Sequence, residues 1–202
     1  RNLGLLVCCL LVLITVNGGA KIKKGEIVAL WLFNDGSGKT LKDASGNGNH
    51  GKLIEGPTLD KGKFGGALKF NSVKRQRVKV ENADSLNLTD QISILAWGLV
   101  SDTTGNRRFV QKSTEGSDNQ YRLLREEVFS RFDAGPSVSN SRVQYPMFKE
   151  NEWHHVAVIY NGKTTALYID GKQTAEQKST GKMVPSAGPL FIGTKHPGAP
   201  AG

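Results

Sequence analysis

The chain has 202 residues, 38% hydrophobic and 22% charged, and its 27 Lys and Arg outnumber 18 Asp and Glu to give a formal charge of +9. This length and composition fit one globular domain and exclude a disordered chain. The positive charge favours anionic partners. No helix-turn-helix, zinc-finger or RNA-recognition motif is present, so nucleic acid is set aside as a partner.

The N-terminal stretch from Leu3 to Val16 is almost entirely apolar and is followed by the small residues Gly18, Gly19 and Ala20. This pattern predicts a signal peptide over residues 1–20 and a secreted, extracellular mature chain over residues 21–202. The alternative, a membrane anchor, needs about 18 apolar residues, more than this run supplies. Both cysteines fall inside the predicted leader, which excludes disulfides and a thiol nucleophile from the mature chain.

From residue 26 onwards, short apolar runs alternate with turn residues, and no stretch shows a helical hydrophobic stripe. The pattern predicts an all-β, antiparallel two-sheet sandwich. The expected strands are Ile27–Phe33, Ala67–Phe70, Arg77–Val80, Ile92–Val100, Arg108–Lys112, Tyr121–Leu124, Val128–Phe132 and Arg142–Tyr145.

A three-stranded meander is expected from Trp153 to Gln177, because Asn161-Gly162 and Asp170-Gly171 are hairpin turns between alternating runs. Ile92–Val100 is apolar at almost every position, which is typical of a central strand covered on both faces. Trp97 in this strand is therefore expected in the core.

Several motifs occur in a fixed order and together resemble the laminin-G-like branch of the concanavalin A-like lectin and glucanase superfamily. They are Trp31-Leu-Phe-Asn-Asp35-Gly-Ser-Gly38, Asp43-Ala-Ser-Gly-Asn47-Gly-Asn49-His-Gly51, Phe64-Gly-Gly-Ala-Leu-Lys-Phe70, Ile92 to Trp97, Trp153-His-His-Val-Ala157 with Tyr168-Ile-Asp-Gly171, and Leu190-Phe-Ile-Gly193. The resemblance covers residues 28 to 193. It implies a jelly-roll sandwich, often with one structural calcium, in a family whose members bind sugars or proteins.

The loop at Asp43, Ser45 and Asn47 places oxygen side chains at alternate positions before Gly48, a spacing that suits calcium. An EF-hand is excluded because the twelfth position is Ile54 and no flanking helices are expected. The alternative is a plain Asn-Gly turn. Together with the resemblance, the loop predicts a structural calcium bound by Asp43 and Asn47, with Asp35 and Asn49 as further candidate ligands.

No catalytic motif is recognisable, and the chain is expected not to be an enzyme. Glucan-cleaving relatives present carboxylates on one face of a strand, a pattern missing here, and Glu126-Glu127 diverge while Glu150 and Glu152 precede Trp153 in a loop. The adjacent His154-His155 point to opposite strand faces and cannot converge on one ion.

Arg75, Arg77 and Lys79 alternate with Val78 and Val80, so a strand here would place three cations on one face. We interpret this face as a contact for a sulfated or uronic glycan, because arginine pairs bidentately with such groups. A solvated cationic edge strand is the open alternative.

Tyr121, Tyr145 and Phe148 are the candidate aromatic residues for stacking on sugar rings. The sequence therefore predicts a secreted, non-catalytic module that binds an acidic or sulfated glycan or takes part in adhesion. Two alternatives stay open: a module that binds an extracellular matrix or cell-surface protein without sugar affinity, and a glucan hydrolase. The resemblance also predicts a final strand beyond Leu190-Phe-Ile-Gly193 that this chain lacks, so a fragment of a larger protein is expected.

Overall fold

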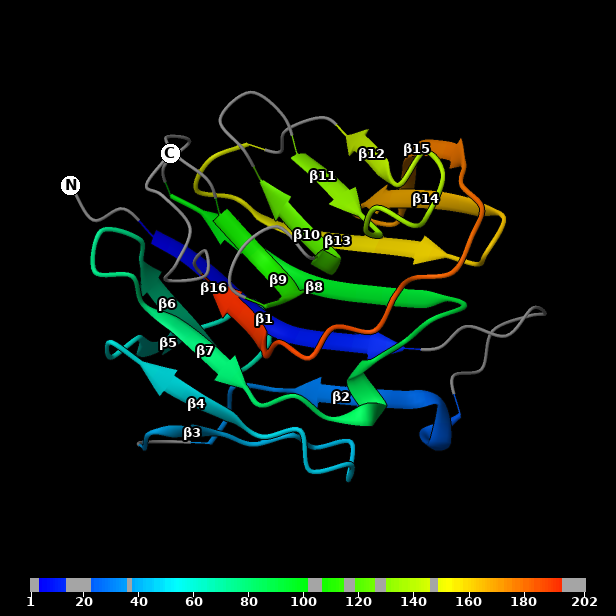
Figure 1. Ribbon diagram of the computed structural model, residues 1–202. Helices are drawn as coiled ribbons and strands as arrows, with labels where there is room; N and C mark the ends of the chain where they lie inside the picture. Colours follow the sequence, from blue (N-terminus) through cyan, green and yellow to red (C-terminus); the bar gives the residue numbers. More distant parts are fainter. Residues whose placement is uncertain are drawn as a thin grey trace.

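A computed structural model describes residues 4–13, 23–35, 38–101, 107–114, 119–125, 130–145 and 149–193. Within these residues, strands form two antiparallel eight-stranded sheets that lie face to face (Figure 1). Two short 3₁₀ helices, Lys24–Glu26 and Asp84–Leu86, complete the described secondary structure. The expected all-β two-sheet sandwich is confirmed. None of the helices in the described ranges has the length and hydrophobicity to cross a membrane.

Sheet A has the strand order β15-β14-β13-β8-β1-β6-β5, and β2 pairs with β1 beside β6. Its strands are β1 (Gly4–Leu13), β2 (Ile27–Trp31), β5 (Thr58–Lys61), β6 (Gly66–Asn71), β8 (Ile92–Val100), β13 (Trp153–Tyr160), β14 (Thr164–Ile169) and β15 (Lys172–Lys178).

Sheet B has the strand order β12-β11-β10-β9-β16-β7-β4-β3. Its strands are β3 (Thr40–Leu41), β4 (Gly51–Ile54), β7 (Arg77–Val80), β9 (Arg107–Ser113), β10 (Asn119–Arg125), β11 (Ser130–Asp133), β12 (Arg142–Tyr145) and β16 (Leu190–Gly193). In Figure 1 this sheet lies in front of sheet A.

The core fills the space between the sheets and is built by alternating strand residues, as the two-residue period of a strand requires. On β8 the inward positions are Ile92, Ile94 and Ala96, all fully buried. Trp31 on β2 is also fully buried, and its indole N–H donates to the carbonyl oxygen of Asn49 at 2.9 Å. Burying this large ring with its polar group satisfied stabilises the sandwich.

The predicted meander is confirmed: β13, β14 and β15 pair in succession. Gly162 in the first turn and both Asp170 and Gly171 in the second adopt positive φ. Tight hairpin turns require this backbone conformation, which explains the choice of Asn-Gly and Asp-Gly.

The expectation that Trp97 belongs to the core is wrong. Trp97 is only partly buried and lies outside the main core, in a small outer cluster around Ala67. Its neighbours along the strand, Ala96 and Gly98, face the opposite side of the sheet, and Ala96 points into the core. The strand is apolar on both faces because its outer face carries this second cluster.

The segment predicted as a leader, Gly4–Leu13, forms β1 near the middle of sheet A. It pairs antiparallel with β8 on one side and with β6 and β2 on the other. Removal of this segment by signal peptidase stays a prediction, and the expected cleavage site after Ala20 lies outside the described residues.

Candidate functional site

The outer face of sheet B carries a row of mostly polar side chains that crosses seven strands. Residues directly opposite each other in an antiparallel ladder share a face of the sheet, so the row follows from the register. Its ends, Lys52 and Arg142, are exposed, and its centre at Gln111 is buried. In strand order the row reads Lys52, Lys79, Phe191, Gln111, Arg122, Asp133 and Arg142.

A second row runs beside the first on the same face, with the order Arg108, Leu124, Arg131 and Gln144. Leu124 is fully buried but lies outside the core cluster between the sheets, as expected of a residue on the outer face. Nε of Arg108 donates to Oε1 of Gln111 at 2.9 Å and connects the two rows. Together with Arg77, which stands two residues before Lys79, these rows define what we call the basic face.

Arg122, Asp133 and Arg142 form an ionic cluster where the first row reaches β10, β11 and β12. Nη2 and Nε of Arg122 lie 2.8 and 3.2 Å from Oδ2 of Asp133, and Nε of Arg142 lies 3.4 Å from the same oxygen. Burial alone would raise the pKa of Asp133, but the hydrogen bond and charge of Arg122, the Gly135 N–H and the charge of Arg142 together lower it. The carboxylate stays ionised and holds both arginines on this face.

The structure places two of the three residues of the predicted cationic strip on one face of β7, and their role as a glycan contact stays a prediction. Arg77 and Lys79 lie outward on β7 while Val78 and Val80 are buried in the core. Arg75, however, precedes the strand in a turn, with φ of 54°. Its carbonyl oxygen accepts a hydrogen bond from Nη1 of Arg77 at 2.8 Å. Burial lowers the pKa of Arg77, although nearby Glu55 opposes this.

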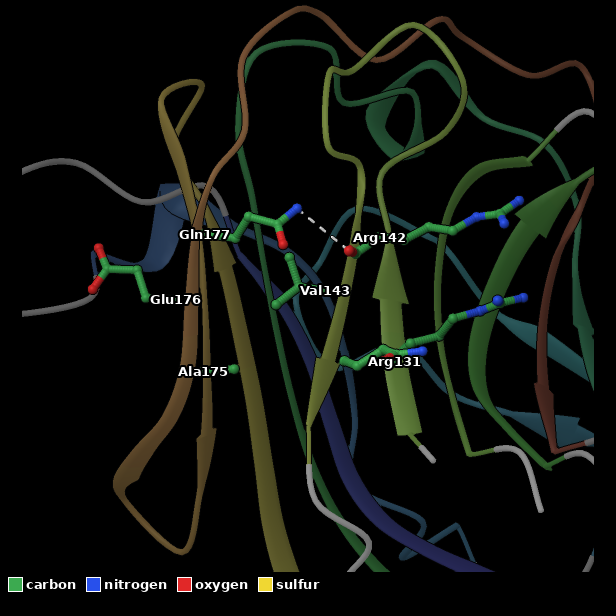
Figure 2. A pocket seen from close by; sticks show the side chains of 7 residues that line it. Arg131, Arg142, Val143, Ala175, Glu176 and Gln177 are labelled. Carbon is green, nitrogen blue, oxygen red and sulfur yellow. Dashed lines mark hydrogen bonds between the residues drawn. The ribbon is translucent and has the colours of Figure 1, made fainter. Parts of the chain in front are cut away.

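A hollow of about 410 Å³ opens beside the basic face, where β11 and β12 of sheet B approach β15 of sheet A (Figure 2). Arg131 and Arg142 line it, yet Figure 2 shows both side chains extending away from Gln177 and Glu176. Nε2 of Gln177 donates to the carbonyl oxygen of Arg142 at 3.4 Å, which ties the two sheets together at this edge. The hollow thus borders the basic face without enclosing its arginines.

The stacking role predicted for Tyr121 is wrong, because its ring is fully buried between the sheets. Its hydroxyl donates to the carbonyl oxygen of Leu86 at 3.0 Å, and burial raises the pKa of the phenol. Tyr145 lies at the end of β12, and its side chain falls outside the described part of the molecule, as does Phe148.

The loop at Asp43 is organised by hydrogen bonds to the carboxylate. Oδ1 of Asp43 accepts from the N–H groups of Leu30 and Ser45, both at 2.9 Å. Oδ2 accepts from the hydroxyl of Ser45 at 2.8 Å and from the N–H of Asn49 at 2.9 Å. These bonds attach the loop to β2.

The other candidate calcium ligands use their amide nitrogens to hold the same loop. Nδ2 of Asn47 donates to the carbonyl oxygens of Ile27 and Val28, and Nδ2 of Asn49 also donates to Val28. Asp35 is separate and accepts from the N–H of Lys42 at 2.8 Å. Within the described residues, no group of three His, Cys, Asp or Glu could hold a metal ion.

Calcium prefers several free oxygens, and this arrangement does not present them. Asp43 meets four donors, and the two asparagines direct nitrogens toward backbone carbonyls. The set as arranged does not fit a calcium ion, and the calcium site stays a prediction.

The two histidines support a turn. Nδ1 of His154 lies 2.6 Å from Oδ2 of Asp170, and the N–H of His155 donates to Oδ1 of the same carboxylate at 2.8 Å. Burial lowers the pKa of His155, while the charge of Asp170 opposes the shift. Glu152, a candidate acid of the hydrolase alternative, is exposed and pairs with Lys149 at 3.5 Å.

Sequence reasoning missed an aromatic cluster on the outer face of sheet A. The ring centroids of Phe64 and Trp97 lie 5.3 Å apart in an edge-to-face arrangement, and His155 lies 5.4 Å from Trp97. Nζ of Lys63 stands 5.7 Å from the centroid of the Trp97 ring. Phe64 is 63% exposed. The signal in the sequence was the alternation along β13, which places Trp153 and His155 on the same outer face as Trp97.

Three solved structures of similar fold show how such sandwiches occur in larger proteins. Domain 4 of AbnA, an extracellular arabinanase from Geobacillus stearothermophilus in complex with arabinotriose, matches with a TM-score of 0.63 and 15% identity over 82% of each chain. The binding domain of Paraclostridial Mosquitocidal Protein 1 matches with a TM-score of 0.60 and 13% identity over 80% of this chain and 44% of the other. The binding domain of botulinum neurotoxin DC in complex with SialylT gives a TM-score of 0.56 and 19% identity over 79% and 42%.

At these identities the likeness concerns the fold alone, and this chain spans less than half the length of the two toxin binding domains. A search of curated protein sequences finds no significant match. A laminin-G-type family model, described as the concanavalin A-like lectin/glucanases superfamily, matches residues 73–201. The chain therefore belongs to the concanavalin A-like lectin/glucanases superfamily.

Proposed function

We infer that this protein is an extracellular binding module that captures acidic or sulfated glycans on its basic face. The observation that carries this proposal is the placement of Lys52, Lys79 and Arg142 along one row of sheet B, with Arg77 beside Lys79. Cations spaced across the strands of a sheet can pair with a linear polyanion, whose charges repeat along an extended chain.

The electrostatics of the face support an anionic ligand. Asp133 is the acidic residue in the two rows, and its charge is shared between Arg122 and Arg142. The two rows otherwise contribute Lys52, Lys79 and further arginines. Such a face attracts sulfate and carboxylate groups more strongly than neutral sugars, and salt weakens that attraction.

Binding without catalysis is the second part of the proposal. Glu81, which lies beside the basic face, is held in an ion pair with Lys79 at 2.8 Å. Asp133 carries a lowered pKa and is engaged by two arginines, whereas a general acid needs a raised pKa. Binding domains among the solved structures of similar fold agree with a binding role.

The test is titration of the protein with sulfated, uronate-containing and neutral oligosaccharides at low and high salt. Replacing Arg77 and Lys79 together by glutamine should weaken binding of the acidic ligands about tenfold, a loss of about 1.4 kcal/mol. The matched control replaces Lys172 and Lys178, two exposed lysines on β15 of sheet A, by glutamine. It changes the net charge equally and should leave affinity nearly unchanged.

Equal losses in both double variants would show that only net charge matters, which contradicts a site on the basic face. A complete lack of glycan binding, together with specific capture of an extracellular protein, would favour the protein-binding alternative. Release of reducing sugar from a glucan would reopen the hydrolase alternative.

A further inference from the structure

The hollow beside the basic face combines two kinds of lining. Its volume of about 410 Å³ falls within the range of small-molecule sites, roughly 300 to 1,000 Å³. Two apolar residues line it from the edge strands of the two sheets, Val143 on β12 and Ala175 on β15. The polar side chains of Gln144, Glu176 and Gln177 line it as well. A ligand group that fits here carries both an apolar part and hydrogen-bonding atoms.

The side-chain amide of Gln177 has a fixed orientation. Its Nε2 donates to the carbonyl oxygens of Asn140 at 2.7 Å and of Arg142 at 3.4 Å. Both partners can only accept, so the nitrogen faces them and Oε1 faces away. Figure 2 shows Oε1 directed toward Val143, and in the described part of the chain no side chain or backbone group donates to it. The hollow therefore presents an acceptor that calls for a donor from a ligand.

The charges around the hollow are separated. Arg142 lies at the outer rim, where its side chain is 65% exposed and extends away from Gln177. Glu176 lines the hollow from β15 and adds negative charge on that side. A carboxylate or sulfate inside the hollow would face the lone pairs of Oε1 and the charge of Glu176, whereas at the rim it can pair with Arg142. The hollow thus suits an uncharged group that is joined to a charged one.

An acetamido group meets these requirements together. Its N–H can donate to Oε1 of Gln177, and its carbonyl oxygen can accept from the exposed side-chain amide of Gln144. Its methyl group can cover Val143 and Ala175 and remove apolar surface from water. A sugar hydroxyl in the same place can donate to Gln177 but leaves that apolar surface uncovered.

We propose that the hollow binds the acetamido group of an N-acetylated sugar, next to an acidic sugar that pairs with Arg142. The preferred ligand is then a glycan in which acidic and N-acetylated units alternate. This inference rests on the proposed function, because the basic face holds the acidic units. It makes Gln177 and Ala175 the residues that select among acidic glycans.

The test compares two octasaccharides by isothermal titration calorimetry at one low salt concentration. The first alternates glucuronate and N-acetylglucosamine, and the second has the same linkages with glucose in place of N-acetylglucosamine. Both carry equal numbers of carboxylates at the same spacing, so they differ only in the acetamido groups. The wild-type protein should bind the acetylated octasaccharide about tenfold more tightly, a difference of about 1.4 kcal/mol.

Two variants alter the hollow and keep every cation. Gln177→Leu removes the acceptor, and Ala175→Leu fills the space for the methyl group. Each should bring the two affinities within about twofold of each other by lowering affinity for the acetylated octasaccharide. The matched control is Gln173→Leu, the same change at an exposed position of β15 outside the hollow, which should keep the preference. Thermal unfolding identifies a variant that does not fold, and the other hollow variant then carries the comparison.

Equal affinity of the wild-type protein for both octasaccharides would overturn the inference and leave the proposed function standing. A preference that both hollow variants retain would also overturn it, because the acetamido group would then bind elsewhere. Failure of both octasaccharides to bind would overturn it as well. In that case the titration with sulfated oligosaccharides decides separately whether the basic face binds acidic glycans at all.

Discussion

Nη2 of Arg122 lies 2.8 Å from Oδ2 of Asp133, and the two residues stand directly opposite each other on β10 and β11. The pair is nearly shielded from solvent, with the side chain of Arg122 13% exposed and that of Asp133 5% exposed. Arg142 on β12 contacts the same carboxylate, but its side chain is largely exposed, so this ion pair contributes little to the stability of the fold. Asp133 therefore anchors the basic face to the sheet.

Replacing Asp133 by asparagine should destabilise the protein by about 2 kcal/mol, because Arg122 would keep its burial and lose its carboxylate. The loss should depend on pH. A carboxyl whose pKa is lowered by folding contributes stability that is present above its unfolded pKa of about 3.9 and is lost as pH falls through the folded value.

Urea unfolding of both proteins between about pH 7 and pH 3 measures this effect. The difference between wild type and Asp133→Asn should shrink as the solution is acidified. A difference that stays constant over this range would mean that the charge of Asp133 contributes nothing and that only side-chain shape matters.

Tyr121→Phe should lower the free energy of unfolding by about 1 kcal/mol. The change removes the hydroxyl that donates to the carbonyl oxygen of Leu86 but keeps the ring in the core. Glycan affinity should not change, because the side chain does not reach the basic face. Thermal unfolding and oligosaccharide titration of the same variant check both statements. A large drop in affinity with unchanged stability would restore the stacking role expected from the sequence.

Gly66→Ala should lower the free energy of unfolding by about 3 kcal/mol, near the upper end of the range for overpacked sites. A Cβ at this position would overlap the carbonyl oxygen of Phe33, and backbone there cannot move aside easily. Gly25→Ala is the matched control, because nothing lies within 4 Å of the corresponding Cβ. Equal melting temperatures for the two variants would argue that the loop at Phe33 adjusts freely.

The sequence predicted much of the fold because strand period and turn chemistry are local signals. The bounds of β7, β8 and β12 agree with the expected ranges, and both hairpin turns of the meander form where Asn-Gly and Asp-Gly stand. β4 and β5 were missed, because neither short segment combines a clear alternation with a run of β-branched residues.

The site was harder to predict because it depends on register between distant strands. Arg77 and Lys79 were recognisable from alternation on one strand. The convergence of Arg122, Asp133 and Arg142 needs three strands paired in a particular register, which no local pattern encodes. The position of Tyr121 was wrongly predicted for the same reason. Neighbouring residues on β10 face opposite sides of the sheet, and in the structure Tyr121 faces the core while Arg122 faces outward.

The two carboxylate oxygens of Asp43 accept hydrogen bonds from Leu30, Ser45 and Asn49. Asp43→Asn should destabilise by about 2 kcal/mol in the presence of a calcium chelator, because the new NH₂ group cannot accept and leaves backbone donors unpaired. Asp35→Asn is the control, because Asp35 is exposed and accepts one bond from Lys42. Thermal unfolding of both variants with chelator and with excess calcium distinguishes the two roles of the loop. Destabilisation by Asp43→Asn in both conditions supports a hydrogen-bonding role. If added calcium instead raises the wild-type melting temperature and Asp43→Asn matters only when calcium is present, the carboxylate is a metal ligand and the loop rearranges to free its oxygens.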